Sequence, residues 1–266
     1  MKNLKEYIKE SILGDWNTVN ADEISEKQQR SEVEKFLNEN YNGDFTISYK
    51  PNKNGKFEVS SDSDVIVKNK QLDRLTNDLF EFTNVKEDFI CADCKSLITL
   101  EGAPKKVFRN FDCTGCKSLT NLEGTPKKVD GCFYCNHCYS LTSLKGAPKE
   151  VWDFWCDYCT SLKSLKGTPK KVRGNFSCKS CDYLKSLEGA PKEVGGNFYC
   201  ISCISLTSLK GAPEKVGEDF TCRFCKLTSL EGAPKEVGGN FTCYDCGKFT
   251  KEDVEKVSKV KGDIRV

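Results

Sequence analysis

The chain has 266 residues, with 41 basic and 39 acidic side chains and a formal net charge of +2 at pH 7. This balance gives no global field that would favour nucleic acid or a membrane surface as a partner. No apolar run approaches the ~18 residues of a membrane span, and the N-terminus lacks the apolar core of a signal peptide. We therefore expect a cytoplasmic protein without nucleic-acid or membrane partners, long enough for one extended domain and a small one.

Residues 1–19 are predicted to form an N-terminal amphipathic helix and a linker, with a loop at Asp15–Asp22. Apolar side chains recur at helical spacing, namely Leu4, Tyr7, Ile8, Ile12 and Leu13. One interpretation is a helix docked on the body of the protein. The other is an address, because MKNLKEYIKESIL is similar to the N-terminal head-targeting segments of tailed-phage internal proteins. An address would place the chain in a virion or in the host cytoplasm.

Residues 20–63 are predicted to form a small α+β cap. A helix is expected to start near Ser25 or at a capping box that begins at Ser31. Two alternating segments, 45–49 and 57–59, then flank a loop that contains Pro51 and Gly55, which indicates a hairpin.

Residues 64–248 are dominated by a repeat. Each unit contains a CxxC pair, and successive pairs are 21 or 22 residues apart, beginning at Cys91, Cys113, Cys135, Cys156, Cys178, Cys200, Cys222 and Cys243. In the unit VGGNFYCISCISLTSLKGAP, at 194–213, Phe198 and Cys200 point to one side of a short strand. Cys203, Leu206 and Leu209 follow at intervals of three residues and are also predicted to point inward. A Gly-Ala-Pro turn then reverses the chain, and a segment that contains a valine, the return leg, leads back to the next strand. A degenerate unit at 65–75 lacks the cysteines.

No single unit can bury its own Phe, Cys and Leu side chains, so we expect the units to stack about 4.8 Å apart. The pattern F-x-C-x-x-C-x-x-L-x-x-L resembles the leucine-rich repeat, with the second Cys in the Asn/Cys ladder position. The LTSLxGAP tail is similar to that of bacterial short leucine-rich repeats. This resemblance implies an α/β solenoid: a right-handed coil with a parallel β-sheet on its concave face. It also implies a general protein-binding scaffold, of unknown oligomeric state.

Residues 249–266 are predicted to form a helix-strand C-terminal cap. Thr250 opens a helix to about Lys259, and the segment 260–266 overlays 237–243 as a last strand.

The CxxC pairs allow three interpretations. Between the last Cys of one pair and the first Cys of the next there are 17 or 18 residues, which matches the spacing of zinc ribbons and makes a zinc-stabilised scaffold an alternative. Adjacent rungs are also close enough for a disulfide, although parallel side chains give a poor dihedral angle. Against zinc, every linker has the same pattern, whereas four-cysteine sites would use the pairs two at a time. We therefore favour buried free cysteines that pack as small apolar groups, with no metal or cofactor, and Cys132 as the most reactive thiol.

The sequence offers no catalytic set, because His137 is the only histidine and has no fixed nucleophile or carboxylate beside it. We expect a non-enzymatic protein that binds a partner protein through its concave face. The outward residues on either side of the first Cys vary from unit to unit, whereas the inward residues do not. Aromatic and charged side chains gather there, as in protein-binding hot spots. The predicted partner-binding residues are Tyr134, Trp155, Asp157, Tyr158, Tyr199, Arg223 and His137. Alternatively, Trp152 and Trp155 fill the gap left by a shortened linker.

Lysines follow most of the repeat prolines and form a row along one turn edge. Nearby glutamates largely offset their charge, so we expect a solvated edge and not a nucleic-acid stripe. The row contains Lys105, Lys127, Lys149, Lys170, Lys192 and Lys235.

Overall fold

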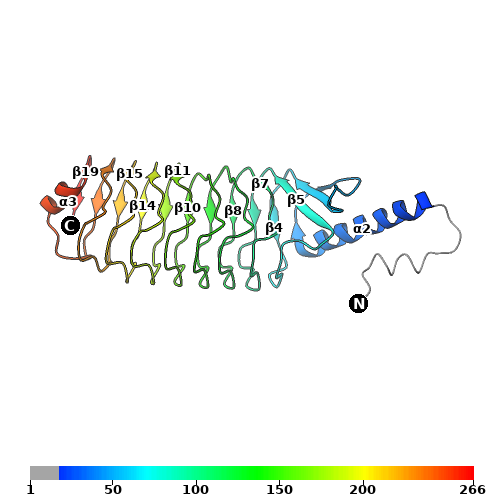
Figure 1. The fold of residues 1–266 in the computed structure, drawn as a ribbon, viewed down its shortest axis with the longest axis horizontal. Coiled ribbons are helices and arrows are strands. Elements are labelled where there is room, and N and C mark those ends of the chain that lie inside the picture. Colours follow the sequence, from blue (N-terminus) through cyan, green and yellow to red (C-terminus); the bar gives the residue numbers. More distant parts are fainter. Residues whose placement is uncertain (1–17) are drawn as a thin grey trace.

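The protein is a β-solenoid. A computed structural model describes residues 18–266, and the predicted amphipathic helix at 1–13 lies outside the described residues. Ten parallel strands, one from each coil, lie side by side along the long axis in Figure 1. Helix α2 (Thr18–Asn40) lies at one end and α3 (Lys251–Val257) at the other. Within the described residues the coils contain strands and turns but no helix, so the fold shown is all-β between its caps.

The longest sheet forms one side of the solenoid. Its strands are parallel from β4 onward, and β1 pairs antiparallel with β4. Phenylalanine faces phenylalanine in this register, as in Phe154↔Phe176 and Phe198↔Phe220. The order is β1 (Tyr41–Asn42), β4 (Val65–Val67), β6 (Phe89–Ile90), β8 (Phe111–Asp112), β9 (Phe133–Tyr134), β10 (Phe154–Trp155), β12 (Phe176–Ser177), β14 (Phe198–Tyr199), β16 (Phe220–Thr221), β18 (Phe241–Thr242) and β20 (Ile264–Arg265).

Two further sheets are formed by the return legs and the N-terminal cap. The predicted valine return leg is a five-stranded parallel sheet of β11 (Lys171–Val172), β13 (Glu193–Val194), β15 (Lys215–Val216), β17 (Glu236–Val237) and β19 (Lys259–Val260). At the N-terminal end a four-stranded sheet contains β2 (Phe45–Ile47), β3 (Phe57–Ser61), β5 (Phe80–Val85) and β7 (Lys106–Val107). Strands β2 and β3 form the predicted hairpin, with Ile47 opposite Val59.

The core is a set of identical side chains stacked coil on coil. Phe111 and Phe133 are fully buried, and their ring centroids lie 5.4 Å apart with planes 10° from parallel. The inward positions of the step-of-three series are buried as predicted, for example Cys203, Leu206 and Leu209. Complete burial of each such Phe or Leu stabilises the fold by about 1.5–3 kcal/mol, and only neighbouring coils can provide that burial.

The two ends close the stack differently. Helix α2 begins at Thr18, within the predicted loop and before Ser25, and it packs Val33 and Leu37 into the end of the core. At the other end Thr250 caps α3 in a capping box with Asp253. The predicted overlay of the last strand is confirmed, because Val237 pairs with Val260 and Phe241 with Ile264.

Candidate protein-binding face

The cysteines form two hydrogen-bonded columns inside the solenoid. All 17 are free, and all except Cys132 are buried. The Cys181 thiol donates to the carbonyl of Cys156 in the preceding coil at 3.3 Å. The Cys156 thiol donates in the other direction, to Ser177 of the following coil, at 3.2 Å. The thiols therefore hold neighbouring coils together as donors, a role that our packing interpretation did not include.

The geometry of these thiols does not suit a zinc site. Within residues 18–266 no three His, Cys, Asp or Glu side chains are grouped to hold a metal ion. Burial also raises the pKa of the Cys113 and Cys135 thiols well above the usual value, which disfavours the thiolate that a metal needs. The zinc interpretation thus has no support among the described residues, and the cysteines are all free thiols.

The predicted face lies on the outer side of the long sheet. Tyr134 and Trp155 occupy paired positions on β9 and β10 and are half-buried. Ser177 on β12 separates Trp155 from Tyr199 on β14. Burial raises the pKa of the Tyr134 and Tyr199 phenols, so both stay neutral donors at physiological pH. The parallel register thus brings three predicted residues to one side of four successive coils.

Lys179, which is not among the predicted partner-binding residues, lies between the rings of Trp155 and Tyr199. Its ammonium lies 4.4 Å from the ring centroid of Tyr199 and 5.9 Å from that of Trp155. Asp157 accepts hydrogen bonds from the Ser177 hydroxyl and, at 2.8 Å, from the backbone N–H of Lys179. The Lys179 ammonium thus contacts rings of two neighbouring coils, and the sequence of one repeat unit does not reveal such a contact.

A second aromatic group lies along the edge where the CxxC segments turn. His137 and Tyr158 stack with centroids 4.6 Å apart, and His137 Nδ1 lies 3.2 Å from the hydroxyl of Tyr139. Exposed apolar side chains continue this edge at Tyr183, Ile204 and Phe224. The predicted His137 and Tyr158 therefore belong to an exposed ridge beside the sheet and not to the sheet itself.

Arg223 lies away from the centre of the face. It belongs to the seventh CxxC coil, four coils and roughly 19 Å from Tyr134 at the usual strand spacing. Its guanidinium donates to the hydroxyl of Tyr244 and lies 5.0 Å from the centroid of that ring. Arg223 thus contacts Tyr244 and the ridge residue Phe224, and not the group of Tyr134, Trp155 and Tyr199.

Trp152 does not join Trp155. It follows the buried Val151 of the return leg and is 53% exposed, whereas Trp155 lies on β10 of the long sheet. Trp152 therefore does not fill the gap left by the shortened linker, contrary to the alternative interpretation.

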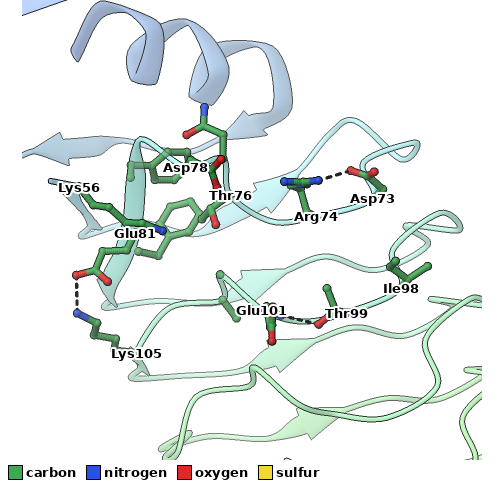
Figure 2. Close-up of a pocket in the computed structure, with 15 residues that line it drawn as sticks. Lys56, Asp73, Arg74, Thr76, Asp78, Glu81, Ile98, Thr99, Glu101 and Lys105 are labelled. Atoms are coloured by element: carbon green, nitrogen blue, oxygen red, sulfur yellow. Dashed lines mark hydrogen bonds and ion pairs between the residues drawn. The ribbon is translucent and has the colours of Figure 1, made fainter. Parts of the chain in front are cut away.

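A polar groove lies at the N-terminal end and was missed by the sequence analysis. Figure 2 shows Asp73 and Arg74 on one side and Thr99 and Glu101 on the other, while Lys105 and Glu81 form an ion pair. The groove has a volume of about 590 Å³. The first coil, at 65–75, has no Gly-x-Pro turn, so the turn of the second coil, at Gly102, has no equivalent turn stacked on its N-terminal side. The absence of that turn from the sequence of the first coil could have indicated the groove.

In comparisons with known families, curated proteins and solved structures, no match was found. Within residues 18–266, no helix has both the length and the apolar character to cross a membrane.

Proposed function

We propose that this protein is a non-enzymatic scaffold that binds a partner protein through the outer side of the long sheet and the adjoining exposed ridge. The main support for this proposal is the difference in residue types between the inward and outward sides of each strand. Inward positions repeat Phe and Cys, whereas outward positions change from coil to coil. A repeat that stacks identical cores leaves its outer residues free to specify a partner.

The composition of this surface supports protein recognition. Aromatic side chains dominate binding hot spots because they bury a large area with few rotatable bonds. Tyr158, Tyr183 and Phe224 are 46%, 61% and 48% exposed, so much of their area is free for a partner.

The coils are best assigned to the leucine-rich-repeat type, as right-handed turns. Support comes from the order of elements in each unit: a strand, a ladder cysteine, a leucine series and a turn. The thiol of the second Cys bonds the preceding coil, as a ladder residue should, for example from Cys203 to the Cys178 carbonyl at 3.1 Å. An experimental structure that shows left-handed coils would overturn this assignment.

The competing function is a virion or assembly component addressed by residues 1–13. Those residues lie outside the described part of the chain, so this function rests on the similarity of the segment alone. Deletion of residues 1–14 separates the two functions. Loss of incorporation into particles with retained partner binding would favour an address, whereas unchanged incorporation would count against it.

The binding face is tested with exposed residues, so that folding is preserved. We expect the double variant Tyr158→Ala/Phe224→Ala to weaken capture of the partner from cells of the source organism at least about tenfold, since hot-spot truncations cost over about 1 kcal/mol each. The matched control is Trp152→Ala, a similarly exposed aromatic on the return leg. Equal loss in the control, or no loss in the double variant, would place the binding site elsewhere. Cross-linking of the captured complex should map to the ridge.

A further inference from the structure

The lysine row along the proline turns has an unneutralised section in its middle. Lys127, Lys149 and Lys170 occupy the same position in three successive coils and are exposed. The backbone N–H of Lys149 donates to the Lys127 carbonyl at 2.8 Å, so their Cα positions are held in register. Within residues 18–266 none of these three ammonium groups has a carboxylate within 4 Å, the limit for an ion pair.

The rest of the row is neutralised. Lys105 pairs with Glu81 at 2.7 Å near the N-terminal end. Towards the C-terminus Glu214 replaces a lysine in the row and lies between Lys192, at 4.0 Å, and Lys235, at 3.8 Å. The positive section is therefore bounded on both sides by ion pairs.

The neighbouring column shows that this stacking of like charges is not a general property of the repeat. One residue further along each coil the charges alternate from Lys128 onward, and Lys171 pairs with Glu193 at 2.8 Å and Lys215 with Glu236 at 3.6 Å. Like charges on adjacent strands disfavour folding. The nearby carboxylates are also already engaged, because Asp130 pairs with Lys128 at 2.9 Å, Glu123 with Lys145 at 2.7 Å and Glu150 with Arg173 at 3.6 Å.

We infer that Lys127, Lys149 and Lys170 form a docking row for an acidic polypeptide segment. Lysine ammonium groups are compact point charges on flexible stems, which suit carboxylates presented at variable spacing. The row contains no arginine, the residue best fitted to bidentate phosphate binding, and no aromatic residue on which bases would stack. An extended acidic segment places same-side carboxylates about 6.6 Å apart, within reach of lysines on rungs about 4.8 Å apart.

The test uses the full chain and a fluorescent poly-L-glutamate peptide of about 15 residues, whose binding is measured by anisotropy. We expect binding that weakens as salt rises, because exposed charges are screened. The variant Lys127→Gln/Lys149→Gln/Lys170→Gln should bind at least about tenfold more weakly, a loss of about 0.5 kcal/mol per exposed charge pair. The matched control is Lys210→Gln/Lys215→Gln/Lys235→Gln, which removes three lysines that already have ion-pair partners.

Three results would overturn the inference. Equal loss in both variants would mean that only the net charge matters, and absence of peptide binding by the unaltered chain would mean that the row does not bind acidic segments. Tighter binding of an oligothymidylate than of poly-L-glutamate, lost in the row variant, would identify a phosphate site instead. None of these results depends on the binding face of the long sheet, so the two proposals fail independently. Circular dichroism of both variants would confirm that each is folded.

Discussion

The imidazole of His137 and the ring of Tyr158 stack with their planes 6° from parallel and their centroids 4.6 Å apart. Both residues occupy the position before the second Cys of a CxxC pair, and both have left-handed backbone angles, with φ of 56° and 58°. Because every CxxC coil repeats this conformation, each coil except the one with Gly115 directs one side chain outward at the same place. The stack is thus a product of the repeat, and it places two predicted binding residues in contact.

The first prediction concerns this stack. We expect His137→Ala to weaken capture of the partner, because Tyr158 loses the ring that restrains it and an unrestrained side chain loses more entropy on binding. The midpoint of thermal unfolding should change by less than about 3 °C, since an exposed surface contact contributes about 0.5 kcal/mol. Calorimetry and a pull-down measure the two effects. A large loss of stability with unchanged capture would make the stack structural.

The second prediction concerns the thiol donors. Cys181→Ala removes the hydrogen bond to the Cys156 carbonyl and leaves a small cavity, so we expect the free energy of unfolding to fall by about 2–3 kcal/mol. Cys181→Ser keeps a donor at the same position and should cost less. Urea unfolding of both variants measures the difference. If serine were the more damaging substitution, the thiol would act only as an apolar packing unit.

The third prediction concerns stability at alkaline pH. Burial raises the pKa of the Cys113, Cys135 and Cys222 thiols well above the usual value of about 8.5. Above that pH the unfolded chain releases these protons while the folded chain retains them. The stability is therefore complete below about pH 8.5 and falls as pH rises, by about 1.4 kcal/mol per pH unit for each thiol. Unfolding in urea at pH 7, 9 and 10 measures the slope, and a flat profile would contradict protonated core thiols.

The fourth prediction concerns thiol reactivity. Cys132 is only half-buried and occupies a position that an amide or carboxylate fills in most other coils, as where Asn175 accepts from the Asn197 N–H at 2.9 Å. We expect N-ethylmaleimide to add once to the folded chain, at Cys132, because the other thiols are buried. Mass spectrometry counts the adducts, and Cys132→Ser should abolish labelling. Rapid labelling of several cysteines would mean that the coils open.

The fifth prediction concerns the turn glycines. At Gly146, φ is +94° and an added Cβ would lie 2.4 Å from backbone atoms of Leu122 and Glu123 in the preceding coil. Gly146→Ala should therefore lower the free energy of unfolding by more than about 3 kcal/mol. Gly55 provides the control: its φ is +72°, but nothing lies within 4 Å, so Gly55→Ala should cost only about 1 kcal/mol. Equal losses would show that backbone strain, and not close stacking, constrains the turns.

The sequence by itself determined the period of the coil, the inward residues and the last strand. A core built from copies must repeat its apolar residues at one interval, so Phe198, Cys200 and Leu206 reveal their burial by recurrence. The last strand could be found in the same way, because Ile264 falls where Phe241 falls one coil earlier.

Only the tertiary structure decided which side chains meet across coils. Lys179 beside Tyr199, the stack of His137 on Tyr158 and the unpaired row at Lys149 all join residues about 20 positions apart in the chain. Their contact depends on the register of parallel strands, with Ser177 aligned on Tyr199, which short-range pattern does not specify. The start of α2 at Thr18 was missed, because Val33 and Leu37, which pack this helix against the end of the solenoid core, lie in its second half and do not mark its beginning.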